Sequence, residues 1–357
     1  MQSFGVRLVA PKEGADSRRG GAGPSDHKAV TIDGVTVMAP VHTAPAFESP
    51  YLVEKPDQFG RSRLTRDGAT IAEVSFPLRP QFYELKTAEG VPYSHIATLH
   101  GRDVLATTVL QTCIRYQSRT KTCQFCAIGQ SLAAGRTIAH KSPAQLGEVA
   151  EAAVRLDGVK HMVMTTGTPK GEDRGAAVLA QSAAGVKARV NLAIQVQCEP
   201  PEDDAWYGRM REAGADALGM HLEAVTEEVR HRIMPGKATV SVERYMKAFA
   251  AAVPVFGRGQ VSTYILAGLG DTREEILSVS ERLVGLGVYP FVVPFTPISG
   301  TPLESHATPS PAFMASILGP LAGIIRAGGL AAEDVKAGCA KCGACSALST
   351  FEKRLRA

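Results

Sequence analysis

Two groups of three cysteines dominate the chemistry that this chain could perform. The first group is Cys113, Cys123 and Cys126, and only two residues separate its last two members. Thiolates at such short spacing bind metal ions and iron–sulfur clusters. Three thiolates leave one iron of a four-iron cluster without a protein ligand, and an open iron can hold a reactive ligand. The loop that carries these cysteines is therefore the first candidate for a reactive site.

Zinc is an alternative to a cluster at this loop. A structural zinc site needs four ligands, and the loop offers three. His140 or Cys198 would have to supply the fourth. Buried structural cysteines are a weaker alternative, because residues 117–121 are polar and offer no core for the thiols to join.

The second group is Cys339, Cys342 and Cys345, with the spacing CxxCxxC. This spacing matches the first three ligands of a bacterial ferredoxin run, but the fourth position, 349, is a serine. We interpret the group as a second cluster with a distant fourth ligand or an open iron. Cys198 is the best internal candidate for that ligand, although a cysteine at the end of a buried strand is often a small core residue. A zinc knot or free thiols are the alternatives.

Composition narrows the class of protein. The chain has 357 residues, of which 45% are hydrophobic, enough for a sizeable core. A formal charge of +4 gives no reason to expect a nucleic-acid or membrane partner, and no apolar run is long enough to cross a bilayer. An odd count of seven cysteines, six of them in two tight groups, and the absence of a signal-peptide pattern predict a reducing, cytoplasmic location. Residues 13–26 are Gly/Ser/Arg-rich and are predicted to be disordered.

The sequence pattern of the central part of the chain alternates between strands and helices. Strand-like runs are predicted over 107–112, 161–166, 189–197, 216–222, 260–267 and 289–294. Helical patterns follow over 142–158, 174–186, 202–213, 226–233 with 241–252, 272–286 and 310–327. Six such units predict an α/β fold, a partial (β/α)6 TIM-like barrel over 105–327. Residues 1–104 form a β-rich N-terminal extension with hairpins at Asp33-Gly34 and Asp67-Gly68, and residues 328–357 a C-terminal cysteine-rich segment.

The carboxyl ends of parallel barrel strands meet at one rim, where such folds place their chemistry. Polar and glycine-rich residues collect at these predicted ends. They include Cys113, the run 166–168, Cys198 with Glu199, His221 with Glu223, the run 268–271 and the run 294–301. Turns also collect such residues, so each cluster alone is an ambiguous sign of a site.

The cysteine loop resembles the signature of the radical S-adenosylmethionine (SAM) superfamily, in which an aromatic residue precedes the last of three cysteines. Phe125 occupies that place. Further motifs follow along the chain in the family's order. The last of them, the run 294–304, resembles the biotin-synthase-like branch. The resemblance implies SAM contacts from Phe125, Thr166, Gly167, Thr168, His221, Glu223, Leu269 and Pro294, and Glu199 is a further candidate. One departure is clear: nine residues separate the first two cysteines, where the family usually has three.

The resemblance implies a definite chemistry. The open iron of a [4Fe–4S] cluster binds SAM, an electron enters the sulfonium, and the resulting 5′-deoxyadenosyl radical abstracts hydrogen from a small-molecule substrate. A reductant such as ferredoxin or flavodoxin would supply the electron. Arg115 and Arg119 lie in the long spacing and could bind an anion. The nine-residue spacing and the cysteine tail further resemble an uncharacterised bacterial family that occurs beside nitrilases in cyanide-assimilation gene clusters, which suggests a nitrile-related substrate.

Three other functions remain open. A sulfur-inserting enzyme would sacrifice the C-terminal cluster, as in lipoyl synthase. An iron–sulfur electron carrier or scaffold would hold clusters without cleaving SAM. A zinc-stabilised binding barrel would hold neither cluster. Several other enzyme classes are disfavoured because the chain has no phosphate-binding loop, no dinucleotide fingerprint, no HExxH and no serine nucleophile elbow.

Overall fold

The computed structural model describes residues 1–9, 26–116, 118 and 120–355, and its strands form two sheets. The segment predicted to be disordered, apart from Asp26, and Arg119 both lie outside the described residues. The strands of the first sheet are β1 (Arg7–Leu8), β2 (His27–Ile32), β3 (Val35–Pro40), β4 (Tyr51–Val53), β5 (Arg61–Arg66) and β6 (Ala69–Ser75). Those of the second are β7 (Thr98–His100), β8 (Val104–Thr108), β9 (His161–Thr165), β10 (Ala193–Gln197), β11 (Ala217–Gly219), β12 (Val261–Ala267) and β13 (Val288–Pro294).

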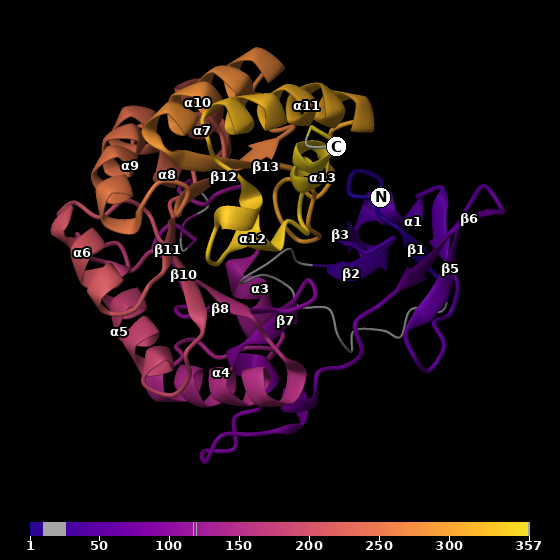
Figure 1. Ribbon diagram of the computed structural model, residues 1–357, viewed down its shortest axis with the longest axis horizontal. Coiled ribbons are helices and arrows are strands. Elements are labelled where there is room, and N and C mark those ends of the chain that lie inside the picture. Colours follow the sequence, from indigo (N-terminus) through magenta and orange to yellow (C-terminus); the bar gives the residue numbers. More distant parts are fainter. Residues whose placement is uncertain (10–25, 117, 119, 356–357) are drawn as a thin grey trace.

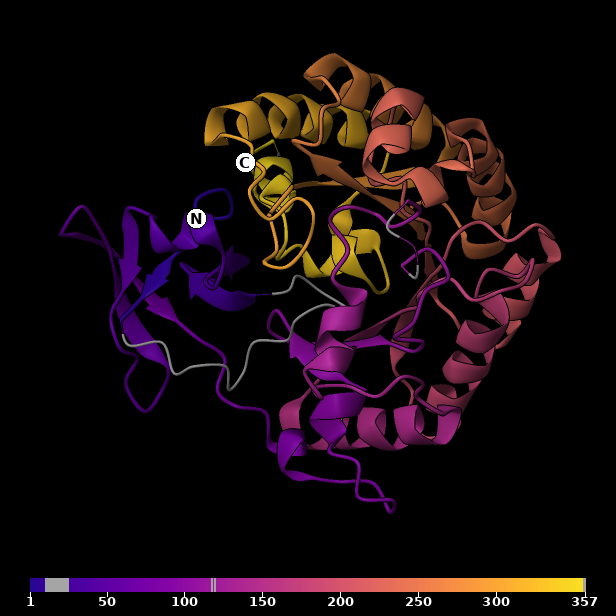
Figure 2. The same cartoon turned by 180° about the vertical axis from the view of Figure 1, so that it is seen from behind.

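Helices cover the outside of the second sheet (Figures 1 and 2). The main ones are α4 (Pro143–Asp157), α5 (Ala176–Lys187), α6 (Ala205–Glu212), α7 (Glu227–Ile233), α9 (Val242–Phe256), α10 (Arg273–Leu286) and α11 (Pro311–Ala327). Shorter helices are α1 (Ala44–Phe47), α2 (Tyr93–Ile96), α3 (Ile128–Ala133), α8 (Pro235–Ala238), α12 (Cys339–Cys342), α13 (Leu348–Arg354), and the 3-10 turns η1 (Gln81–Glu84) and η2 (Ala332–Asp334). No helix in the described ranges has the length and apolar character needed to span a bilayer.

The second sheet is the predicted partial barrel. Strands β8 to β13 run parallel in sequence order, and β7 adds an antiparallel edge beside β8. The order begins at β13 and ends at β7, so the sheet curls without closing. The main hydrophobic core lies between these strands and the outer helices. The sequence analysis missed β7, a three-residue strand whose partner is the adjacent β8.

The first sheet confirms both predicted hairpins. Strands β2 and β3 pair antiparallel around Asp33-Gly34, and β5 and β6 pair around Asp67-Gly68. All four turn residues have positive φ, as a two-residue turn between twisted strands requires. Val30, Leu64 and Val74 contribute to a separate small core beneath this sheet.

Local capping sets the helix boundaries. The Ser142 hydroxyl accepts from the Gln145 N–H, the Gln145 side chain accepts from the Ser142 N–H, and Gly158 ends α4 with φ 63°. Helix α10 ends at Leu286, in agreement with the predicted range 272–286. Gly287 follows it with φ 89° and takes the left-handed conformation that closes the helix.

Three strands differ from their predicted ranges. Strand β8 stops at Thr108 because the next residues turn to a new partner: Gln111 N–H donates to Ala139 O, and Leu110 bridges His140. Strand β10 begins only at Ala193, after residues 188–192 have completed the turn from α5. Strand β11 ends at Gly219, and beyond it the Leu222 N–H bonds to the Thr263 hydroxyl instead of a backbone carbonyl.

The C-terminal segment enters the barrel, where α12 lies inside the ring of strands (Figure 1). Backbone groups of this segment bond to side chains on the barrel strands: Gly338 N–H donates to His161 Nδ1, and Cys339 N–H donates to the Gln195 side chain. From the other side, Met38 N–H of the first sheet donates to Ala344 O at 2.7 Å. The first sheet and the barrel thus hold the second cysteine group between them.

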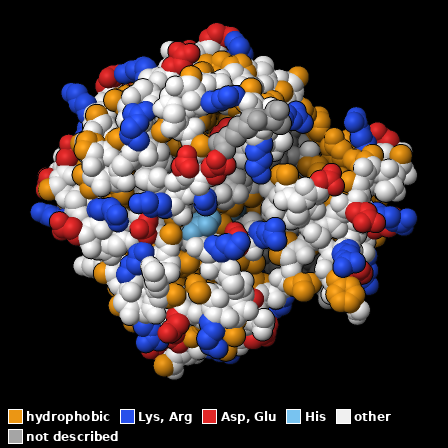
Figure 3. Space-filling view, viewed as in Figure 1, with side chains coloured by type: hydrophobic (Ala, Val, Ile, Leu, Met, Phe, Trp, Pro, Cys, Tyr) orange, Lys and Arg blue, Asp and Glu red, His pale blue; other side chains and the backbone are white. Residues whose placement is uncertain are grey.

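The outer surface shows no concentration of one charge sign in the view of Figure 3. Lys and Arg side chains alternate there with Asp and Glu side chains. This mixture agrees with the small net charge of the chain.

Arg230 is expected to be a stability centre of the barrel. Its side chain is fully buried and donates to the carbonyls of Leu222, Ala224 and Val240. Replacing Arg230 with Met leaves these carbonyls without a donor, so we expect the free energy of unfolding to fall by about 3 kcal/mol or more. Urea titration of the purified protein measures the change.

The matched control for this stability prediction is Arg282→Met. Arg282 pairs with Glu243 on the surface, where its side chain is 50% exposed. Exposed ion pairs of this kind contribute less than about 1 kcal/mol. Equal effects from the two substitutions would contradict the role given to Arg230.

Candidate active site

The first cysteine group lies on a loop between β8 and α3 that two neighbouring helices fix in place. Gln124, between Cys123 and Cys126, donates its N–H to Ile233 O at the end of α7. Its side-chain amide donates to Arg232 O at 2.6 Å. At α8, the Gly236 N–H donates to Lys121 O, and a Cβ on Gly236 would lie 2.4 Å from that oxygen. The loop is thus attached through backbone contacts that its own sequence does not reveal.

The three thiols of this loop are half-buried and line one cavity of about 310 Å³. Burial raises the pKa of Cys126 to about 11, and it raises the pKa of Cys123 well above the ordinary range. Both thiols are therefore protonated in the free protein, and binding of iron must displace their protons. Within residues 1–9, 26–116, 118 and 120–355, no three His, Cys, Asp or Glu side chains converge as one metal ion requires. A cluster binds each thiolate to a different iron, so it fits this arrangement better than zinc does.

Most of the predicted SAM-contacting residues line this same cavity. They are Phe125, Thr166, Gly167, Thr168, Glu199, His221 and Glu223. Two predicted contacts do not. Leu269 is buried in a small hydrophobic cluster against which Cys123 and Phe125 pack, and Pro294 lines a second, neighbouring cavity.

The Thr166–Thr168 turn lies directly against the cysteine loop. Ile114 N–H donates to Thr168 O, and a Cβ on Gly167 would lie 2.1 Å from Thr112 O. No other residue type fits at position 167 without displacing that backbone. The close approach explains why a glycine follows β9 at this point.

Glu199 is held by cations and does not project freely into the cavity. Arg115 donates to its two carboxylate oxygens at 2.7 and 2.6 Å, and the Thr168 hydroxyl donates at 2.8 Å. Burial opposes ionisation of this carboxyl, yet Arg115 outweighs it and lowers the Glu199 pKa. An external anion would therefore have to compete with Glu199 for the Arg115 guanidinium.

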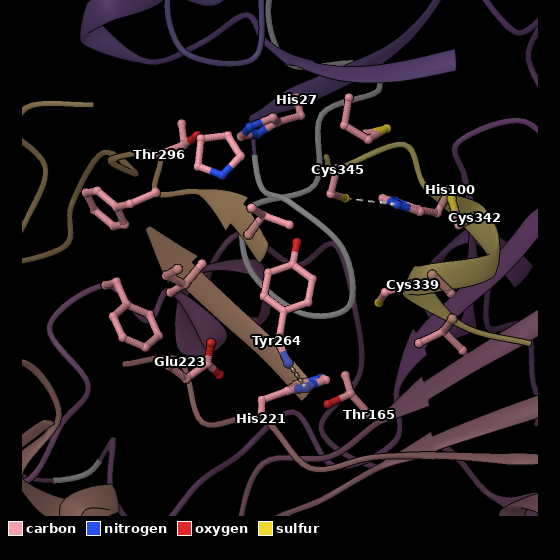
Figure 4. Close-up of a pocket in the computed structure, with 18 of the residues that line it drawn as sticks. His27, His100, Thr165, His221, Glu223, Tyr264, Thr296, Cys339, Cys342 and Cys345 are labelled. Carbon is pink, nitrogen blue, oxygen red and sulfur yellow. Dashed lines mark hydrogen bonds between the residues drawn. The ribbon is translucent and has the colours of Figure 1, made fainter. Parts of the chain in front are cut away.

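His221 is held as a neutral ring. The Tyr264 N–H donates to His221 Nδ1 at 3.1 Å, which places the remaining ring proton on Nε2. Burial lowers the His221 pKa to about 4, so the neutral form persists at physiological pH. Figure 4 shows this ring beside Tyr264 and Thr165 on the wall of the cavity. His221 can therefore donate one hydrogen bond to a bound molecule.

Glu223 has an unusual backbone conformation. Its φ is 65°, a region that non-glycine residues rarely adopt, and its backbone bonds to Tyr264 O and Leu266 N–H hold it there. Lys237 donates to its carboxylate at 3.1 Å. Desolvation works against the Lys237 charge, but Glu223 prevails and the Lys237 pKa is raised. Lys237 and Glu223 thus form a largely buried ion pair at the cavity wall.

A second cavity of about 290 Å³ adjoins the first and contains the second cysteine group (Figure 4). Cys339, Cys342 and Cys345 all line it, together with His27 from β2 and His100 from β7. The two cavities lie side by side, because both are lined by Phe125, Thr165, Gln197, His221, Glu223 and Ile298.

Cys198 is not positioned as the fourth ligand of the second group. Its neighbour Gln197, the last residue of β10, lies with its Nε2 3.4 Å from Cys339 Sγ. Cys198 follows the end of β10 and belongs to the main hydrophobic core. Of the two cavities, its side chain lines the first and not the one that contains the second group.

Sequence reasoning missed several residues of the site. His27, His100, Lys237 and Tyr264 line one cavity or the other, although none belongs to a recognisable motif. Tyr264 had the only local signal, because it alternates with Leu266 on the lumen face of a predicted strand. The others arrive from distant elements and are visible only in the assembled fold.

Part of the chain matches a known protein family. Residues 120–283 match the model of the radical SAM superfamily. The chain carries a radical SAM domain. The match includes Cys123 and Cys126 and begins after Cys113, and the domain implies a [4Fe–4S] cluster and SAM as cofactors.

Individual relatives match only part of this chain. Bacteriochlorophyllide c C-7(1)-hydroxylase of Chlorobaculum limnaeum is 30% identical over 121 residues, which are 33% of this chain and 30% of that protein. A lipoyl synthase of Geobacillus sp. (strain WCH70) is 27% identical over 169 residues, 46% of this chain and 53% of that protein. Among solved structures, methylornithine synthase has a TM-score of 0.49 and 17% identity, covering 72% of this chain and 75% of that one. The chain thus spans about half or less of the length of the hydroxylase and of the lipoyl synthase.

Proposed function

We propose that this protein is a radical SAM enzyme that acts on a small molecule held between two iron–sulfur clusters. The observation that carries the proposal is the adjacency of the two cavities, with Cys113, Cys123 and Cys126 in one and Cys339, Cys342 and Cys345 in the other. A molecule at the junction would touch Phe125, His221 and Glu223. The rest of the chain would be organised as an N-terminal extension (1–104), a barrel (105–327) and a C-terminal cluster segment (328–357).

The residues of the first cavity fit the cofactors of this class. Three thiols are available for a cluster with an open iron, and the adjoining walls carry a neutral imidazole and a carboxylate. When bound, the cluster and SAM supply a 5′-deoxyadenosyl radical that removes hydrogen from the substrate. The chain's own residues orient SAM and exclude water, with His221 Nε2 as a donor and Glu223 as an acceptor. Thr166, Gly167 and Thr168 supply backbone groups at the same wall.

The first test is a cofactor and cleavage assay on anaerobically reconstituted protein. Iron and sulfide per chain are measured together with 5′-deoxyadenosine formed from SAM and dithionite. The proposal predicts about eight irons for two four-iron clusters, together with cleavage. Clusters that never cleave SAM, with or without candidate substrates, would favour an electron carrier or scaffold. A colourless protein with stoichiometric zinc would favour a zinc-stabilised barrel.

Glu223→Gln is expected to weaken SAM binding by tenfold to a hundredfold. A hydrogen bond to a charged group contributes about 1.5–3 kcal/mol, and the amide retains the shape of the carboxylate without its charge. Equilibrium dialysis of SAM against the reconstituted protein measures the dissociation constant. Glu202→Gln is the matched control, because Glu202 lies outside both cavities and its side chain is 50% exposed. Unchanged affinity in Glu223→Gln would remove this residue from the SAM site.

Sulfur insertion is a second candidate function, and a specific observation favours it. The second cysteine group lines the wall of the proposed substrate cavity, so the sulfides of a cluster there would be within reach of a bound molecule. Part of the chain is also similar to lipoyl synthases. This function predicts loss of sulfide from the protein and about one turnover per chain when the cluster is not rebuilt. Repeated turnover with constant sulfide content would exclude it.

The surroundings of the reaction also belong to the proposal. We place the enzyme in the cytoplasm, with ferredoxin or flavodoxin as the electron donor. The substrate is proposed to be a small, nitrile-related molecule, in line with a cavity of about 290 Å³. Growth of a deletion strain on cyanide or simple nitriles as the nitrogen source tests that link.

A further inference from the structure

We infer that His100 is the fourth protein ligand of the cluster held by Cys339, Cys342 and Cys345. The inference rests on the second cluster of the proposed function and names the residue that completes it. His100 Nε2 lies 3.6 Å from Cys345 Sγ, and Figure 4 shows the imidazole directed at that sulfur. All four side chains line the same cavity. An imidazole nitrogen is an established ligand of iron in clusters that also have cysteine ligands.

The backbone brings His100 to this position independently of its side chain. His100 pairs with Val104 at the end of the β7–β8 hairpin, and Gly101 follows in the turn with φ 60°. A Cβ on Gly101 would lie 3.1 Å from Cys342 Sγ and 3.6 Å from Ala344 Cβ. The turn residue Gly101 is therefore close to the cysteine segment. A side chain at this position would crowd Cys342 Sγ and would have to adopt a left-handed φ, so glycine suits the approach.

The alternatives for a fourth ligand are less well placed. Cys198 does not line the cavity that contains the second group. Ser349 occupies the fourth position of the ferredoxin-like spacing and lies against Gly343. A Cβ on Gly343 would be 3.2 Å from the Ser349 hydroxyl oxygen. Ser349 does not line the cavity. His27 also lines the cavity, so it serves as the comparison residue in the test below.

A histidine ligand has a measurable consequence for the cluster. An imidazole is neutral, whereas a thiolate carries a negative charge, so the cluster is one charge less negative than one with four cysteines. Replacement of cysteine by histidine ligands raises the reduction potential of iron–sulfur centres. The His100→Cys variant should therefore hold a cluster with a lower potential than the unsubstituted protein. With four protein ligands, the cluster also has no vacant iron in its resting form.

The test uses the full chain with Cys113, Cys123 and Cys126 replaced by alanine, so that only the second cluster assembles. The protein is reconstituted anaerobically and reduced, and pulsed electron paramagnetic resonance records nitrogen couplings to the cluster. We expect a strong coupling that changes when histidine is labelled with ¹⁵N. It should disappear in His100→Cys and persist in His27→Asn. The His100→Cys variant keeps a ligand at this position, so the result does not depend on assembly of a three-ligand cluster.

The outcomes separate the inference from the function on which it rests. A second cluster without a histidine coupling, or with a coupling that survives His100→Cys, overturns the ligand assignment and leaves the two-cluster enzyme intact. A coupling lost in His27→Asn assigns the ligand to His27 instead. Absence of iron from the variant that lacks the first three cysteines overturns the second cluster itself.

Discussion

Replacement of Cys113, Cys123 or Cys126 by alanine is expected to reduce 5′-deoxyadenosine formation by at least about a thousandfold, or about 4 kcal/mol in transition-state stabilisation. Each thiol lines the first cavity, and loss of one leaves a cluster with two protein ligands beside the SAM site. Iron per chain should fall together with activity. The assay uses SAM and dithionite under anaerobic conditions, with iron and sulfide measured on the same samples.

Cys198→Ala is the matched control for these three variants. Cys198 borders the same cavity, but its side chain belongs to the main hydrophobic core. Removing it costs packing and leaves the iron ligands in place. We expect iron content and cleavage close to those of the unsubstituted protein. If one of the three loop cysteines could be replaced without loss of cleavage, or if Cys198→Ala behaved as they do, the ligand set would be wrong.

Local sequence signals predicted much of the architecture. The capping box at Ser142 and Gln145 and the two Asp-Gly turns act within a few residues, so the sequence alone is sufficient to reveal them. Boundaries that depend on a distant partner were less accurate. Strand β8 ends early because residues 109–111 bond to 139–141, and no local pattern announces that partner. Strand β11 is short because a threonine side chain on β12 replaces a backbone acceptor.

The same distinction between local signals and distant contacts applies to the residues of the site. The cysteine groups, Thr166 to Thr168 and His221 were found because short motifs and strand ends mark them. Lys237 and His100 were not, because each meets its partner across more than a dozen residues, as the Lys237–Glu223 and His100–Cys345 contacts show. Cys198 illustrates the opposite case. Residue type suggested a ligand, but in the assembled fold its thiol borders the first cavity and not the second.

The combined substitution of Cys339, Cys342 and Cys345 by alanine is the second test with a large expected effect. We expect it to remove about four irons per chain, half of the total for two four-iron clusters. The first cavity keeps its three cysteines and its SAM-facing residues, so basal SAM cleavage should remain within a few-fold of the unsubstituted protein. Iron, sulfide and 5′-deoxyadenosine are measured on one anaerobic preparation.

The matched control for the triple variant is Lys341→Ala. Lys341 lies between two of these cysteines in α12, and its ammonium bonds to Glu333 O in an exposed position. It tests whether any change in this short segment disturbs the clusters, and we expect the full iron content. Unchanged iron in the triple variant would reduce the C-terminal cysteines to packing or zinc binding. Loss of all iron would instead mean that the first cluster depends on the second. That result would be unexpected, because the two cysteine groups lie in separate cavities that share walls and no thiol.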